Sequence, residues 1–276
     1  MNRSRITPGI RISALLAMTP PAAAPVQASL LAYEGFDYAA GVDISGQSGG
    51  TGWAGAWGYA SNWPGQMSPT GLDNASLAVN GNALSTVGPA PTPLNPAVIY
   101  RDLPELGTSG TTRYFSVLLR PYAADGYQHG EYGCVNFGGI FIGKSGKPGS
   151  DRYGIEGAVN DISYSDVPVT ANQTVLLVLR AEYREGADNF DLFVNPSLDA
   201  LPAEASASKA DYDAGIGAAV LVNNFGNYLT DEIRVGETYA DVVPTTPIPL
   251  PGAALLPGSG LAGLAAARSR SSAARG

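Results

Sequence analysis

The chain has 276 residues, a net charge of −8 and only 14% charged residues, and Gly (35) and Pro (21) together make up about a fifth of it. This composition predicts many turns and few long helices, which favours an all-β domain. Residues 29–244 carry 24 acidic and 10 basic side chains, so nucleic acid and anionic membrane surfaces are disfavoured as partners.

The first 28 residues have the layout of an export signal. Arg3, Arg5 and Arg11 precede an apolar run over residues 12–18, and small residues then lead to Val26-Gln27-Ala28. A basic segment, an apolar stretch and a small-x-small site are the three parts of a secretory signal peptide. We therefore expect cleavage after Ala28 and a mature domain that starts at residue 29.

Short alternating runs predict about nine or ten β-strands in residues 29–244. Two of the runs are separated by Arg184-Glu185-Gly186-Ala187-Asp188, which is the spacing of a hairpin, and residues 77–79 followed by Asn80-Gly81 give a second hairpin signal. Almost no helical period is present, so the strands predict an antiparallel two-sheet sandwich. The runs are 97–102, 111–120, 132–142, 153–159, 174–183, 189–194, 218–225 and 232–235.

All three tryptophans lie in the eleven residues from Trp53 to Trp63. Flat rings with a polar edge suit stacking on sugars, and the glycines between them let a ligand come close. Trp53, Trp57, Tyr59 and Trp63 are therefore candidate carbohydrate-binding residues. The alternative is that Trp53 and Trp57 fill the core, with Trp63 in its Asn-Trp-Pro-Gly turn the most exposed of the three.

Residues 138–145, GGIFIGKS, match the pattern of a phosphate-binding loop. Such a loop must open a helix, but Gly146, Pro148 and Gly149 follow without helical spacing, so we interpret the stretch as a strand ending in a turn. The only cysteine, Cys134, is interpreted as a small buried residue of a strand, and the only histidine, His129, as an exposed loop residue. A disulfide within the chain and a metal site built on a pair of histidines are excluded.

The last segment, residues 245–276, differs in kind from the body. It contains Pro249-Leu250-Pro251, an uncharged stretch to Ala267, and then Arg268, Arg270 and Arg275. From residue 250 to 267 is 18 residues, which just suffices to cross about 30 Å of hydrocarbon. The arginines after it would hold that end in the cytoplasm.

This tail resembles the PEP-CTERM sorting signals of Gram-negative bacteria, in the variant that reads Val-Pro-Leu-Pro-Ala. The matching residues here are Ile248 to Gly252, so Ile replaces Val and Gly replaces Ala, and Pro257 interrupts the apolar stretch. The resemblance implies processing by an exosortase, a membrane protease-transpeptidase. It also implies transient anchoring by the tail and a location in the outer envelope, at the cell surface or in the extracellular matrix.

The body resembles LamG-like, concanavalin A-like jelly-roll sandwiches. The stretches that carry the resemblance are LLAYEGFDYAAG, GGTGWAGAW, FGGIFIGKSG, FDLFVNP and DEIRVGETYADVVP. Rim loops of such sandwiches often bind calcium, which makes Asp188, Asp191, Asp211 and Asp213 candidate ligands. The Glu-x-Asp-x-x-Glu motif of the hydrolases on this fold is missing, and Glu182 and Glu185 fall on a predicted turn.

The leading interpretation is an exported, non-catalytic β-sandwich that binds polysaccharide or acts as an adhesive envelope or matrix component. Two alternatives stay open at this point. One is a divergent glycan-cleaving enzyme on the same fold, and the other is a purely structural surface protein without a ligand.

Overall fold

The computed structural model describes residues 30–246 except 62, 75, 88–96, 124–131, 148–150, 159–160 and 215–218. The expected signal segment up to Ala28, His129, and the sorting residues Pro249, Leu250, Pro251, Arg268 and Arg270 therefore lie outside the described residues. Within the described ranges, no helix has the length and apolar character that a membrane span needs.

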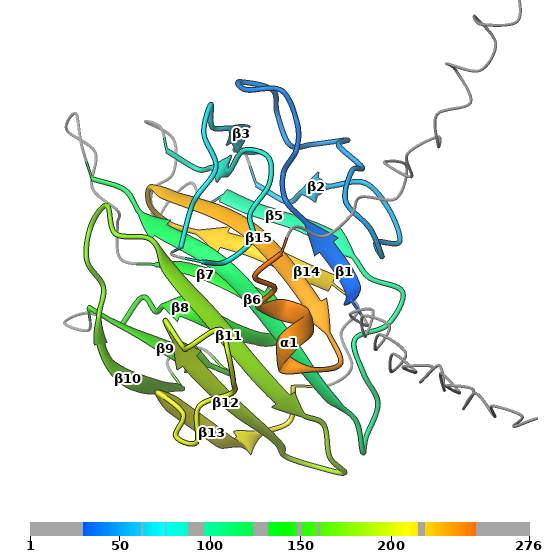
Figure 1. The fold of residues 1–276 in the computed structure, drawn as a ribbon, viewed down its shortest axis with the longest axis vertical. Helices are drawn as coiled ribbons and strands as arrows, with labels where there is room; N and C mark the ends of the chain where they lie inside the picture. The colour runs from blue at the N-terminus through cyan, green and yellow to red at the C-terminus, as the bar shows by residue number, and fades with distance from the viewer. Residues whose placement is uncertain are drawn as a thin grey trace, which may run out of the picture.

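Two antiparallel sheets face each other and form a jelly-roll sandwich, which confirms the predicted fold class (Figure 1). Sheet A has the strand order β13-β12-β11-β6-β15-β4-β3, with β1 also paired to β15. Its strands are β1 (Leu30–Glu34), β3 (Gln66–Met67), β4 (Leu84–Ser85), β6 (Thr112–Pro121), β11 (Val175–Glu182), β12 (Asp188–Val194), β13 (Ala207–Tyr212) and β15 (Tyr228–Gly236).

Sheet B has the order β10-β9-β8-β7-β14-β5-β2. Its strands are β2 (Gly58–Tyr59), β5 (Ala97–Asp102), β7 (Gly133–Phe137), β8 (Ile140–Lys144), β9 (Arg152–Glu156), β10 (Ile162–Pro168) and β14 (Ala219–Asn224). Alternate residues of each strand point into the sandwich, so a short alternating run suffices to supply one side of the core.

The main core fills the space between the sheets. Phe115 of β6 stacks on Phe137 of β7 with ring centroids 4.7 Å apart, which joins the two layers directly. A second, smaller core lies on the outer side of sheet A, where the helix α1 (Tyr239–Val242) covers β6 and β15 (Figure 1). Both faces of sheet A are therefore covered, which explains why β11 is apolar along most of its length.

The structure contradicts one predicted hairpin and divides one predicted strand into two. The predicted hairpin at residues 77–81 is wrong: Leu77 packs into the outer core of sheet A instead of pairing in a ladder, and the Asn80 N–H donates to the Glu232 carboxylate. The run 132–142 contains two strands, because Gly138 and Gly139 take positive φ angles of 63° and 109° and turn the chain.

The stretch that matches a phosphate-binding loop is strand β8, as predicted. Lys144 is buried and pairs with Asp151 at 3.5 Å, and the Ser145 hydroxyl lies 2.9 Å from that of Tyr164. Both side chains of the motif are thus engaged within the fold.

Strand β15 carries a row of buried charges that hydrophobic patterning does not reveal. Asp231, Glu232 and Arg234 are all almost fully enclosed. Arg234 pairs with Glu232, which also accepts a hydrogen bond from the Tyr33 hydroxyl at 3.2 Å. Asp231 accepts hydrogen bonds from the Leu72 and Glu232 N–H groups, each at 2.8 Å. These contacts tie the segment around Leu72 and Leu77, which covers the outer side of sheet A and is called the covering segment below, to strand β15.

Candidate functional site

Two of the three tryptophans surround a buried ion pair. Arg101 pairs with Glu34 at 2.5 Å, and the side chains are 2% and 1% exposed. The Trp57 Nε1–H donates to Glu34 at 2.8 Å, and the Arg101 guanidinium lies 5.0 Å from the ring centroid of Trp53 and 5.8 Å from that of Trp57. With 2% of its surface exposed, Trp57 leaves no ring face open to a sugar.

The two remaining candidates, Trp63 and Tyr59, differ in how far they are exposed. Trp63 packs partly buried against the main core, and its Nε1–H has no partner among the described residues. Tyr59 is 45% exposed. Of the four candidates Trp53, Trp57, Tyr59 and Trp63, only Tyr59 therefore presents a largely exposed ring.

The acidic candidates for calcium are separated and engaged by other groups. Asp188 accepts hydrogen bonds from two backbone N–H groups, at 2.8 and 3.1 Å. Asp191 pairs with Arg180 at 2.5 Å, and Asp211 pairs with Lys209 at 2.7 Å, a hydrogen bond that lowers the pKa of Asp211. In the part of the chain that is described, no three His, Cys, Asp or Glu residues gather as a metal site would need. The set Asp188, Asp191, Asp211 and Asp213 does not form one cluster.

A different surface brings aromatic and polar side chains together: the outward side of sheet B, which we call the aromatic face. Strand pairing aligns Tyr100 of β5, Leu221 of β14, Asn136 of β7, Phe141 of β8 and Glu156 of β9 in one row. Neighbouring strands are about 4.8 Å apart, so this row is about 19 Å long. It is long enough for several linked sugar units.

A second row lies beside the first. Gly143 of β8 and Gly154 of β9 lie side by side in it, between Cys134 and Tyr164. Both glycines are buried, and a Cβ atom on either would lie within 3 Å of a neighbouring backbone atom, so the strands pack closely there. Neither row carries a lysine or an arginine; the second row runs Val98, Asn223, Cys134, Gly143, Gly154 and Tyr164.

The side chain of Tyr100 leans over the neighbouring strand. A Cβ atom at Gly58, its partner on edge strand β2, would come within 2.8 Å of Tyr100 Cζ and 2.9 Å of its hydroxyl oxygen. The tip of the ring can therefore take this position only because residue 58 is a glycine. Of the whole residue, 38% remains exposed.

The other end of the row is more enclosed. Tyr132 packs against Phe225 and Phe141, with ring centroids 5.1 and 6.5 Å apart, and lies close to Glu156 and Cys134. Burial, with added repulsion from Glu156, raises the pKa of the Cys134 thiol, and burial raises that of Tyr132. Cys134 is thus a buried strand residue, as the sequence predicted.

Glu156 is the only acid in the two rows of the aromatic face. Glu156 lies on β9 and is 8% exposed, whereas Asp102 lies on β5, four strands away, at about 19 Å. The described outward positions of β8, β7 and β14 between them carry no acid. Glycosidases hold their two carboxyl groups about 5–9.5 Å apart.

Tyr100 is not among the site residues predicted from the sequence. Its signal was available, since in AVIYRD at residues 97–102 the tyrosine stands at a position that alternates with buried ones. What the run could not reveal is which distant strands extend the row beside it.

No protein-family model matches the chain, and no curated protein sequence matches it either. Among solved structures, the endo-1,3-β-glucanase of Streptomyces sioyaensis is similar with a TM-score of 0.44 and 11% identity, over 79% of this chain and 98% of that one. Domain 4 of the extracellular arabinanase AbnA of Geobacillus stearothermophilus, in complex with arabinotriose, gives 0.40 and 16%, over 79% and 98%. The lectin UEA-II complexed with galactose gives 0.40 and 10%, over 74% and 97%.

Proposed function

We propose that this protein is a non-catalytic glycan-binding β-sandwich that holds a polysaccharide along the aromatic face of sheet B. The observation that carries the proposal is the exposed Tyr100 ring, whose tip lies over Gly58 at one end of a row of aligned side chains. A supported, half-open aromatic ring is a platform on which the apolar face of a pyranose stacks.

The rest of the row supplies complementary groups. Leu221 and Phe141 offer apolar surface, and Asn136 and Glu156, two strands apart and each less than 10% exposed, are the polar members of the row. Since neither row contains a cation and Glu156 is an acid, the face suits neutral glycans better than uronic or sulfated ones. Glu156 is the only acid in the two rows, which supports binding without cleavage.

The sequence at the two ends supports export and sorting as part of the same proposal. The segment ending at Ala28 directs the chain out of the cytoplasm, and the tail with Pro249-Leu250-Pro251 and Arg268 is cut by an exosortase. The product is a component of the envelope or the extracellular matrix. Mass spectrometry of the protein from its producing cells tests this, because a full-length 276-residue product would contradict both steps.

The binding proposal is tested by a glycan array probed with the full chain, with and without a chelator. Retention of neutral polysaccharides that does not depend on the chelator is the expected result. Silence across the array would favour a purely structural surface protein, and release of reducing sugar would favour the glycan-cleaving enzyme.

A further inference from the structure

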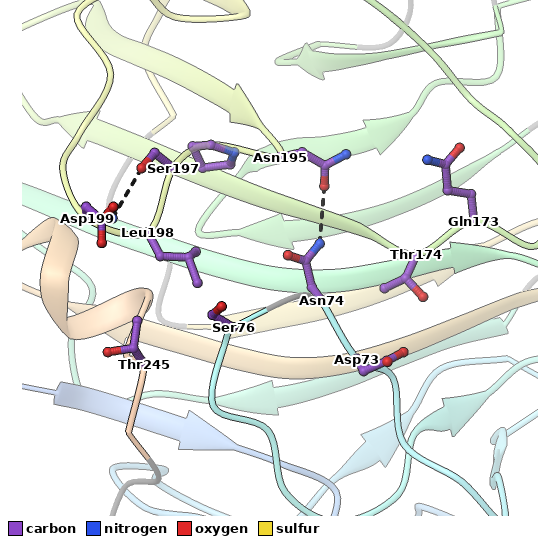
Figure 2. A pocket seen from close by; sticks show the side chains of 11 residues that line it. Asp73, Asn74, Ser76, Gln173, Thr174, Asn195, Ser197, Leu198, Asp199 and Thr245 are labelled. Atoms are coloured by element: carbon purple, nitrogen blue, oxygen red, sulfur yellow. Dashed lines mark hydrogen bonds between the residues drawn. The ribbon is translucent and has the colours of Figure 1, made fainter.

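A polar pocket lies on the sheet A side of the sandwich, away from the aromatic face. Its volume is about 580 Å³, which falls within the usual range for small-ligand sites, about 300–1,000 Å³. Three segments meet there: the residues just before β11, the residues that follow β12, and the covering segment around Asn74 (Figure 2). Gln173 and Thr174 lie at one end of the pocket in this view, and Ser197, Leu198 and Asp199 at the other.

One amide in this pocket is held in a fixed orientation. The Asn195 Oδ1 accepts hydrogen bonds from the Leu176 N–H at 2.8 Å and from the Asn74 Nδ2 at 3.3 Å. Because the Leu176 N–H requires an acceptor, the side-chain atom of Asn195 that faces it must be the oxygen and not the nitrogen. Both Nδ2 hydrogens of Asn195 are then left for another partner. The backbone of Asn195 is left-handed, with a φ of 48°, and its N–H donates to the Leu176 carbonyl at 2.8 Å.

The charge of the pocket selects among ligands. Asp73 and Asp199 both line it, and neither forms an ion pair with any described residue. No lysine, arginine or histidine is among its described lining residues. Phosphate, sulfate and uronic acids are therefore disfavoured, because they would meet two carboxylates without a counter-charge.

The hydrogen-bonding groups fit a polyol. Carboxylates only accept hydrogen bonds, the Asn195 Nδ2 donates, and the hydroxyls of Ser76, Thr174 and Thr245 do both. Neighbouring hydroxyls of a sugar also donate and accept, so each finds a complementary group, while Leu198 offers one apolar contact. The lining residues that the structure describes include no aromatic side chain, which distinguishes the pocket from the aromatic face.

We propose that this pocket is a second carbohydrate site, which takes a single neutral sugar unit and is independent of the aromatic face. The two sites belong to opposite sheets, so one short glycan cannot fill both. A protein with both sites would cross-link glycan chains, and its avidity would exceed the affinity of either site alone.

The test is a titration of the ¹⁵N-labelled full chain with methyl β-glucoside and methyl β-galactoside, followed through side-chain amide signals. A ligand of about a dozen non-hydrogen atoms at ordinary ligand efficiency binds in the millimolar range. We expect the amide signals of Asn74, Gln173 and Asn195 to shift and saturate with at least one of the two glycosides. Methyl β-glucuronide should bind roughly tenfold or more weakly, because of the two carboxylates.

Asn195→Asp is the informative variant. It keeps an oxygen for the Leu176 N–H and a residue that tolerates the left-handed conformation, but replaces the free donor with an acceptor. We expect at least about a tenfold loss of glycoside affinity with little change in melting temperature. Asp199→Asn keeps the size of the side chain and removes one negative charge, so it should reduce the difference in affinity between the glucoside and the glucuronide.

Several results would overturn the proposal. They are a lack of amide shifts with both neutral glycosides, an affinity for the glucuronide equal to theirs, and unchanged binding by Asn195→Asp. Tyr100→Ala should leave these shifts intact, and their loss in that variant would show that the sites are not independent. Failure of the aromatic face to bind polysaccharide would be read on the array, separately from these signals.

Discussion

Replacement of Arg101 by methionine tests the role assigned to the tryptophan-rich segment. The guanidinium pairs with Glu34, donates to the Gly49 and Gly55 carbonyls at 2.8 Å each, and lies over the Trp53 ring. Methionine is apolar and flexible enough to occupy much of the same space. The variant therefore removes the charge from the site without opening a large cavity.

The expected loss of unfolding free energy depends on the hydrogen bonds that Glu34 retains in the variant. Removing one member of a buried ion pair costs about 3–5 kcal/mol, because the other charge stays buried without a counter-charge. Glu34 retains hydrogen bonds from Trp57, Tyr38 and the Phe36 N–H, which places the cost near the lower end, about 3 kcal/mol. Loss of the contact with the Trp53 ring adds about 1 kcal/mol.

A loss of about 4 kcal/mol is a large part of the stability of a typical domain. For a domain of this size it lowers the melting temperature by about 8–16 °C. Urea unfolding of the native chain, Arg101→Met, Glu34→Gln and the double variant gives the coupling between the two side chains. The double variant should recover about 1–2 kcal/mol relative to Arg101→Met, and a loss below about 1 kcal/mol for Arg101→Met would refute the reasoning.

Three further outcomes are expected. Gly58→Val should push the Tyr100 ring off the sheet and weaken glycan binding roughly tenfold, while thermal unfolding changes little because the obstructed atoms are the end of a mobile side chain; unchanged affinity would contradict the platform. Burial raises the pKa of Asp231 well above its usual value, so the folded state binds the proton of this carboxyl group more tightly than the unfolded chain does. The protonated side chain therefore contributes stability below about pH 4, and this contribution is lost as the pH rises. Urea unfolding between pH 4 and 7 should therefore give Asp231→Asn a more positive slope of unfolding free energy against pH than the native chain, and equal slopes would count against that burial effect. Because Asp188, Asp191 and Asp211 already have N–H or cationic partners, EDTA should leave the melting temperature unchanged, and a clear drop would reveal a bound metal.

The fold class could be predicted because the strands that face the main core alternate clearly. The runs at 111–120 and 174–183 correspond to β6 and β11, which pair with each other in the centre of sheet A. Strands β10 and β13 were missed, since each lies at the edge of its sheet and has a largely polar sequence. In β13, one of the two buried positions is a lysine, Lys209, which is held by two aspartates at 2.7 Å each.

The candidate site was harder to predict because it depends on partners distant in the sequence. The tryptophans are close together in the chain, but Trp57 turns inward toward Glu34, 23 residues away, and that carboxylate pairs with Arg101, 67 residues away. The tip of the Tyr100 ring can lie where it does only because Gly58, on another strand, has no side chain. Local composition identified ring-bearing residues, whereas the sheet pairing decides which ring faces the solvent.

The central claim is that the Tyr100 ring is the platform for a neutral glycan. The most direct measurement is affinity electrophoresis in gels containing the polysaccharide retained on the array, with the full chain, Tyr100→Ala and Tyr100→Phe side by side. We expect Tyr100→Ala to lose roughly tenfold or more in affinity and Tyr100→Phe, which keeps the ring, to remain close to the native chain. Equal retardation of the native chain and Tyr100→Ala would contradict the proposal.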